Sequence, residues 1–267
     1  MRRRRWVVAI AVAVVAAVGA TIAVRSLLHE VNPAPPACRI GNGPEALFLD
    51  TEQAANATTI TAVGHRMRLP HHAVTIALAT VLQESKMHNL PYGDRDSVGL
   101  FQQRPSQGWG TPAQLLTPSY AAEAFYLHLE KVDGWEQLPV AEAAQDVQHS
   151  ADGSGYEAWV EEARAIARAL TGEVTGQFSC RFASGARPAP ARLASLADTE
   201  LGPGELHAAP RADRWLVAQW LVGHSFQLGI SQVTVAGHRW RREDFGWARD
   251  NTAGDPPVFV LSRGKAS

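Results

Sequence analysis

An uncharged run of nineteen residues, 6–24 (WVVAIAVAVVAAVGATIAV), restricts what the start of this chain can form. As an α-helix with a rise of 1.5 Å per residue it would reach about 28 Å, close to the thickness of a bilayer core. Four arginines at residues 2–5 precede the run, and positive charge marks the cytoplasmic side of a span. We therefore expect residues 1–29 to form an Arg-rich cytoplasmic start and a single transmembrane helix, with the rest of the chain exported.

A cleaved signal peptide is the alternative interpretation of this run, and it would make the protein secreted. The apolar part of a signal peptide normally has only about 7 to 15 residues, and no clean Ala-x-Ala site is followed here by a polar mature start. The sequence therefore favours an uncleaved anchor in the cell membrane. The proline-rich residues 30–37, which contain NPAPPA, are expected to form a stiff stalk.

Charge and cysteine content describe the exported part further. After Arg25, 20 Lys and Arg stand against 26 Asp and Glu, a formal charge of −6, which argues against nucleic acid as a partner. Cys38 and Cys180 are the only cysteines, and an even pair outside the cytoplasm predicts a disulfide. Two unpaired buried thiols are the alternative. No feature of the sequence identifies a protein partner.

Glu84 is an acidic residue on an otherwise apolar helix face. Its direction lies about 20° from that of Ala77 and about 60° from that of Val81, on the stripe that also carries Val74 and Leu78. Burial would raise the pKa of this carboxyl group and keep it protonated, so that it could act as a general acid. The alternative is an exposed carboxylate in the last turn of a helix that ends before Pro91.

Capping residues and prolines predict the helices around Glu84. Asp50 and Gln53 form a capping-box pattern, Pro70 opens the helix of Glu84, and Thr117-Pro118, Pro139 and Ser154 start later helices. Residues 91–101 combine turn residues with a short apolar run, which indicates a small hairpin or irregular lobe. The predicted helices are residues 50–67, 70–84, 117–132, 139–149 and 154–172.

The C-terminal third divides into two predicted segments. Residues 181–210 are rich in Ala, Pro, Gly and Arg without a clear period and are expected to be a linker. Residues 211–267 predict a small α+β domain with a helix at 213–228 and strands at 230–235, 238–242 and 258–262.

Three short motifs follow one another in the chain: Glu-Ser at 84–85, Gly-Leu-Phe-Gln at 99–102 and Val-Gln at 147–148. In order and spacing they resemble the lysozyme-like family of soluble lytic transglycosylases and goose-type lysozymes. The family pattern is Glu-Ser, Gly-Leu-Met-Gln and Ala-Tyr-Asn, so the second motif departs at Phe101 and the third is only approximate. The resemblance covers residues 38–180 and implies a mainly α lysozyme-like domain with a small β-hairpin lobe.

The resemblance implies that Glu84 is the catalytic acid and that the substrate is a glycan. An amide such as Gln102 can hold an N-acetyl or hydroxyl group, and Trp109, in a glycine-flanked loop, can stack on a sugar face, although core packing is the commoner role of tryptophan. The candidate substrate-binding residues are Ser85, Gln102, Gln103, Trp109 and Gln148.

A second carboxylate would decide the type of reaction. Asp94 or Asp96 could act as a base that activates water and gives hydrolysis, whereas without such a base a hydroxyl of the substrate attacks and forms an anhydro-sugar. Both aspartates are also typical turn residues in the sequence YGDRDS. Their turn role is slightly favoured, and with it transglycosylation.

Metal chemistry is not expected. Ten histidines occur, but no His-x-x-x-His or Cys-x-x-Cys spacing is present. The C-terminal segment resembles a small domain of exported actinobacterial wall proteins that is related in outline to zinc peptidases. The His-x-His pair that usually closes such domains is replaced here by Pro-Val-Phe-Val at 257–260, so we expect neither a metal nor another cofactor.

The sequence thus leads to the hypothesis of a membrane-anchored enzyme that cleaves peptidoglycan glycan strands at the β-1,4 bond between N-acetylmuramic acid and N-acetylglucosamine. Its partners would be these strands and, through residues 6–24, the cytoplasmic membrane. The alternative is a non-catalytic peptidoglycan-binding or scaffolding protein of the cell envelope, and the approximate third motif favours it.

Overall fold

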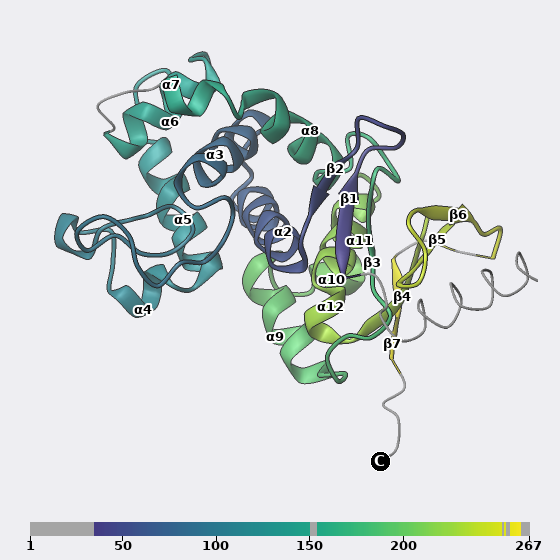
Figure 1. The fold of residues 1–267 in the computed structure, drawn as a ribbon. Helices are drawn as coiled ribbons and strands as arrows, with labels where there is room; N and C mark the ends of the chain where they lie inside the picture. The colour runs from purple at the N-terminus through teal and green to yellow at the C-terminus, as the bar shows by residue number, and fades with distance from the viewer. Residues whose placement is uncertain (1–34, 150–153, 253, 255–256, 263–267) are drawn as a thin grey trace, which may run out of the picture. The chain divides into compact units, whose positions relative to one another are not determined.

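Helices and two small antiparallel sheets make up the part of the chain that the computed structural model describes, which is residues 35–149, 154–252, 254 and 257–262 (Figure 1). The helical elements are α2 (Thr51–Arg66), α3 (His71–Glu84), the 3-10 helix η1 (Pro105–Gln107), α4 (Pro112–Leu115), α5 (Pro118–Leu129), α6 (Val140–Gln148), α7 (Ser154–Glu157), α8 (Val160–Leu170), α9 (Pro190–Glu200), α10 (Glu205–Ala208), α11 (Arg214–Gly223) and α12 (Ser225–Leu228). The strands are β1 (Ala37–Ile40), β2 (Leu47–Leu49), β3 (Phe178–Arg181), β4 (Ile230–Val235), β5 (His238–Arg241), β6 (Trp247–Arg249) and β7 (Val258–Leu261).

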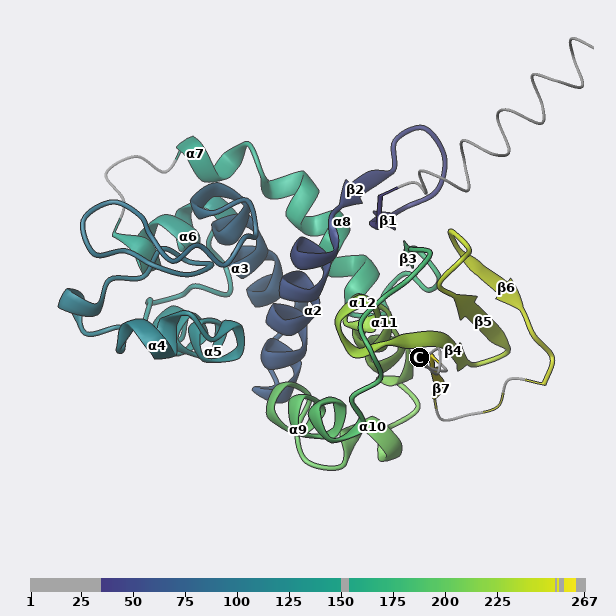
Figure 2. The same ribbon diagram turned by 60° about the horizontal axis from the view of Figure 1, so that its bottom comes forward.

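Helix α2 lies at the centre of these elements. The predicted capping box is confirmed: the side chain of Asp50 accepts the N–H of Gln53 at 2.9 Å, and the N–H of Asp50 donates to the Gln53 side chain at 2.9 Å. All residues from 54 to 64 are buried, because α2 packs against α3 and α5 on one side and against α9 and α11 on the other (Figure 2).

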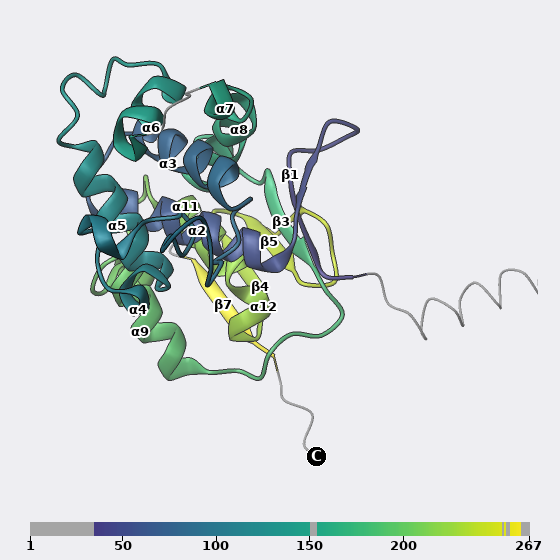
Figure 3. The same ribbon diagram turned by 60° about the vertical axis from the view of Figure 1, so that its left-hand side comes forward.

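Helix α3 carries Glu84 as its last residue and starts directly after Pro70, as predicted. The four apolar residues of the predicted stripe, Val74, Ala77, Leu78 and Val81, are at most 2% exposed. They are enclosed because α6 and α8 pack along α3 (Figure 3).

Two predictions in this region need correction. The single helix expected at 154–172 is divided into α7 and α8, with Trp159 between them as the N-cap residue of α8. The lobe after Glu84 is the irregular alternative expected for residues 91–101 and not the β-hairpin that the resemblance implies, since among the described residues it contains only an isolated bridge between Val98 and Gln103. Turn-forming residues dominate this segment, so its backbone bonds close local turns instead of a strand ladder.

The N-terminal sheet has the strand order β2-β1-β3, and its three short strands are not predicted by the sequence pattern. Cys38 on β1 lies directly opposite Cys180 on β3 in this antiparallel pair. The two residues form the predicted disulfide, which links positions 142 residues apart. The bond therefore joins the strand before α2 to the strand after α8.

The segment expected to be an irregular linker contains α9 and α10, which is a correction. Leu193, Ala197 and Glu200 of α9 are buried, at a spacing of three to four residues that places them on one helix face. The carboxylate of Glu200, 3% exposed, accepts bonds from the Thr59 hydroxyl at 2.9 Å and the Trp220 indole N–H at 2.7 Å. This network fixes α9 between α2 and α11.

The C-terminal sheet has the order β6-β5-β4-β7 and confirms the three predicted strands, with β6 in addition. It is joined to β3, because the indole N–H groups of Trp240 and Trp247 donate to the carbonyls of Cys180 at 2.9 Å and Phe178 at 2.8 Å. From Pro36 onward the described residues form one compact unit.

Among the described residues, no helix has both the length and the apolar character that a membrane crossing requires. The predicted span at 6–24 and most of the predicted stalk lie outside the residues that the structure describes.

Candidate active site

Glu84 ends α3 at the edge of a polar cavity and is half-buried, whereas the stripe predicts a buried side chain. The hydroxyl of Tyr156 donates a hydrogen bond of 2.6 Å to Oε1 of Glu84. Tyr156 lies on the short helix α7 and is itself 2% exposed. The carboxylate is therefore held by a buried donor on one side and faces the cavity on the other.

The cavity has a volume of about 280 Å³ and is predominantly polar. Primary amides are the most frequent groups in its lining, and one arginine and one tryptophan accompany them. The lining residues are Glu84, Asp94, Ser97, Gln102, Gln103, Arg104, Gln107, Trp109, Gln148 and Tyr156.

Two predicted binding residues, Gln102 and Gln148, are fixed in this lining by bonds to backbone. Gln102 has a positive φ of 49°, and its amide donates to the carbonyls of Gly99 at 3.1 Å and Tyr92 at 3.3 Å. The amide of Gln148 donates to the carbonyl of Phe101 at 2.7 Å. The two bonds of Gln102 use both N–H donors of its amide, so its carbonyl oxygen is the atom left for a ligand, whereas the bond of Gln148 uses one of its two N–H donors.

Gln103 and Trp109 also line the cavity but are more deeply set. Gln103 is 2% exposed and donates to the carbonyl of Ala121 at 3.1 Å. Trp109 is 9% exposed, and its ring stacks on that of His128 with the centroids 3.9 Å apart. One face of the indole is thus covered, which leaves at most the opposite face for a sugar.

Ser85, also predicted to bind substrate, is not part of the cavity lining. It is 6% exposed, and its hydroxyl donates to the carbonyl of Leu100 at 2.7 Å. This bond ties the end of α3 to the loop that carries Gln102. Ser85 therefore contributes to the site by connecting two of its walls.

The two aspartates proposed as second carboxylate differ in position. Asp96 accepts the N–H of Ser106 at 2.7 Å and the Nε–H of Arg104 at 2.9 Å, and it is not a lining residue. These hydrogen bonds lower the pKa of Asp96 to about 2, and the bond from the Ser106 N–H has the largest effect. Asp94 lines the cavity, and its side chain is 90% exposed. Asp96 is therefore a turn residue of the loop, and Asp94 is the carboxylate that shares the cavity with Glu84.

Four lining residues were not predicted from the sequence: Ser97, Arg104, Gln107 and Tyr156. Tyr156 is the most informative of them because it contacts Glu84 directly. Its position in an apolar helix pattern predicts only that its side chain is buried in the core. Its partner Glu84 lies 72 residues earlier in the chain, so the local sequence does not indicate the contact.

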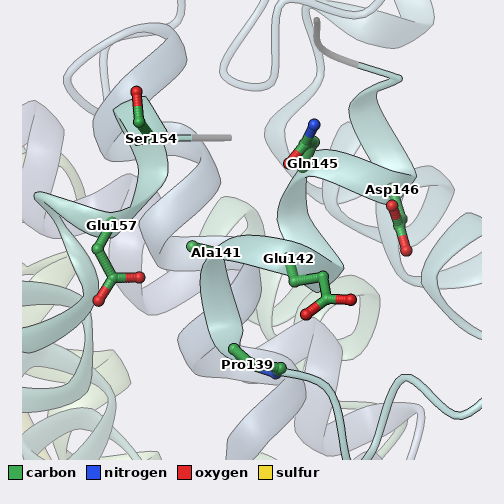
Figure 4. Close-up of a pocket in the computed structure, with 7 residues that line it drawn as sticks. All are labelled: Pro139, Ala141, Glu142, Gln145, Asp146, Ser154 and Glu157. Atoms are coloured by element: carbon green, nitrogen blue, oxygen red, sulfur yellow. The ribbon is translucent and has the colours of Figure 1, made fainter. Parts of the chain in front are cut away.

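A second cavity, of about 550 Å³, lies between α6 and α7 (Figure 4). Glu142 and Asp146 project from α6 and Glu157 from α7, so the charged part of its lining is acidic. Throughout the described part of the chain, no three His, Cys, Asp or Glu side chains are grouped so that they could hold a metal ion. None of the predicted site residues lies in this second cavity.

A protonated carboxyl at Glu84 could donate a proton to a leaving oxygen in the cavity, and the surrounding amides could orient a ligand rich in hydroxyl or acetamido groups.

No protein-family description matches the chain, and no curated protein sequence is similar to it.

Proposed function

We propose that this chain cleaves peptidoglycan glycan strands at the β-1,4 bond between N-acetylmuramic acid and N-acetylglucosamine, as a lysozyme-like enzyme anchored outside the cytoplasmic membrane. The observation that carries the proposal is the position of Glu84, which lies at a helix end, faces a polar cavity and accepts a hydrogen bond from buried Tyr156. Cleavage of a glycosidic bond requires such a carboxyl group beside the leaving oxygen.

The proposed reaction begins with the transfer of the Glu84 proton to the glycosidic oxygen. The bond between this oxygen and the anomeric carbon breaks, and its electron pair stays with the departing sugar. Positive charge then develops at the anomeric carbon of the muramic acid. The Tyr156 hydroxyl, at 2.6 Å from the Glu84 carboxylate, stabilises the negative charge that remains on Glu84.

Intramolecular attack is the proposed second step. A hydroxyl of the muramic acid attacks its own anomeric carbon and gives its proton to Glu84, which yields an anhydro-sugar and consumes no water. Asp96 is engaged with Arg104 and Ser106, and this supports a site with a single catalytic acid. Hydrolysis, with Asp94 as the base for a water molecule, is the competing reaction at the same cavity.

Substrate binding is assigned to the amides of Gln102, Gln103 and Gln148 and to the face of Trp109 that His128 does not cover. A cavity of about 280 Å³ is at the lower end of the size of small-molecule sites. It would accept the part of a glycan around the scissile bond, with the remainder of the strand lying along the surface.

The test is the lysis of purified peptidoglycan by wild type, Glu84→Gln and the control Glu130→Gln, which changes an exposed carboxylate after α5. We expect Glu84→Gln to remain folded and to lose lysis, and the control to retain it. Undiminished lysis by Glu84→Gln would contradict the proposal. Wild type that sediments with peptidoglycan and releases no fragments would select the non-catalytic wall-binding function instead.

A further inference from the structure

The backbone immediately after Glu84 is in an unfavourable conformation. Lys86 and Met87 have φ angles of 54° and 62°, in the left-handed region that side chains with a Cβ atom rarely occupy. The carbonyl of Val81 accepts the N–H groups of both Ser85 and Met87 at 3.1 Å. This tight turn ends α3 at Glu84, and it requires support from neighbouring groups.

Support comes from three residues at the start of α2, which we call the α2 clamp: Glu52, Gln53 and Asn56. The amide of Gln53 donates to the carbonyl of Lys86 at 2.9 Å, and that of Asn56 donates to the carbonyl of Met87 at 2.8 Å.

Glu52, the third residue of the α2 clamp, binds the backbone at Asn89, two residues after Met87. Glu52 accepts the N–H of Asn89 at 3.0 Å. The three positions are one, three and four residues apart, so they share one face of α2. Each successive part of the turn after Glu84 is thus bound from the same helix face.

The side chain of Gln53 also takes part in the capping box of α2, so a substitution at Gln53 can separate its two contacts. Its side-chain oxygen accepts the N–H of Asp50 in the capping box of α2, while its side-chain nitrogen donates to Lys86. The two ends of one amide thus couple the start of α2 to the turn after Glu84.

The turn is also connected to Tyr156, the hydrogen-bond donor to Glu84. The ammonium group of Lys86 lies 3.9 Å from the ring centroid of Trp159, and the N–H of Trp159 donates to the carbonyl of Tyr156 at 3.0 Å. The Trp159 indole donates to Gln83, the neighbour of Glu84 in α3, at 2.8 Å. Lys86 is therefore connected through Trp159 to Tyr156 and to the residue that precedes Glu84.

We infer that Gln53 and Asn56 are positioning residues for Glu84: they hold the left-handed turn that sets the end of α3 and the contact with Tyr156. The catalytic consequence rests on the proposed function, since positioning affects turnover only if Glu84 is the acid. The structural consequence, a fixed turn, does not depend on it.

The decisive variant is Gln53→Glu in the full chain. A carboxylate can still accept the N–H of Asp50, so the capping box is kept, but it cannot donate to Lys86. A second variant, Asn56→Ala, removes the other donor without adding charge. The control is Ile60→Val, which removes one buried methylene from the same helix and disturbs no polar contact.

Two measurements are made on the folded proteins. The first is hydrogen exchange of the Ser85 and Met87 amides, which we expect to become about tenfold faster in both clamp variants and to stay unchanged in the control. The second is turnover of soluble glycan strands, where kcat should fall by about tenfold or more while KM stays within about threefold, because misplacement of a reacting group affects the chemical step.

Unchanged exchange and unchanged kcat in both clamp variants would overturn the inference and leave the proposed function intact. Faster exchange with unchanged kcat would likewise overturn the positioning role. If wild type does not cleave glycan, the proposed function fails, and the exchange data alone then decide whether the clamp holds the turn.

Discussion

The Tyr156 hydroxyl donates a hydrogen bond of 2.6 Å to the Glu84 carboxylate, and the side chain of Tyr156 is almost completely buried. A buried donor of this kind stabilises the negative charge that a general acid acquires when it gives up its proton. The bond also fixes which way the carboxylate points in the cavity. The contact therefore concerns both the orientation and the charge of the proposed catalytic group.

Tyr156→Phe tests this contact. The ring would stay in place and only the donor would be lost, so we expect a decrease in kcat of about 10- to 100-fold with a small change in Tm. Tyr126→Phe is the matched control: Tyr126 is also buried, but its hydroxyl donates to the carbonyl of Ile60 at 3.0 Å. The control should lose stability and keep kcat, and equal kcat losses in the two variants would contradict the assignment.

Asp94→Asn tests whether the reaction needs a second carboxylate. Asp94 shares the cavity with Glu84, but in a site with a single acid it takes no part in the proton transfers. We expect the rate of glycan cleavage to stay within about threefold of wild type, since only an exposed charge is changed. A loss of cleavage of a hundredfold or more would make Asp94 the base of a hydrolytic reaction.

Asp96→Asn should change the dependence of stability on pH. The pKa of Asp96 is lowered from 3.8 to about 2 in the folded chain, so its bonds stabilise the fold above the unfolded value and lose this effect as the pH falls from 3.8 towards 2. The Tm difference between wild type and variant should therefore be constant near neutral pH and shrink in that acidic range. A Tm difference that does not change between pH 7 and pH 2 would contradict this explanation.

Glu200→Ala should be strongly destabilising. The variant leaves the Thr59 hydroxyl and the indole N–H of Trp220 without their buried acceptor, and each unsatisfied buried donor costs about 1–3 kcal/mol. Thr199→Ala changes the exposed neighbouring residue of α9 and should cost less than about 1 kcal/mol. Urea unfolding measures both values. A small loss for Glu200→Ala would show that α9 is not held through this carboxylate.

Local sequence signals were sufficient for much of the fold. The Asp50–Gln53 capping box, the proline before α3 and the alternating residues of β4 all correspond to observed elements, because each depends on neighbours within a few positions. The disulfide between Cys38 and Cys180 followed from the number of cysteines and the expected compartment.

The missed elements depend on distant partners. Strands β1 and β3 are four residues long, and they form because positions 142 residues apart pair with each other. Helix α9 follows an irregular stretch rich in Ala and Pro and buries only three residues, so its helical period is weak in the sequence, although the spacing of Leu193, Ala197 and Glu200 carries the signal.

The candidate site shows the same division. Glu84 and Gln102 were found from motifs, and both line the cavity. Tyr156 is not predicted because nothing in its local sequence indicates that it meets Glu84, which lies 72 residues earlier. Asp94 and Asp96 could not be separated by sequence, since the difference between them is the bonding of Asp96 to Arg104 and Ser106.

Mass spectrometry of the fragments released from purified peptidoglycan tests the central claim most directly. Wild type should release muropeptides that end in anhydro-muramic acid, one water lighter than the products of hydrolysis, and Glu84→Gln should release none. Fragments of the same kind and amount from Glu84→Gln, or no fragments from folded wild type, would contradict the assignment of Glu84 as the catalytic acid of a glycan-cleaving enzyme.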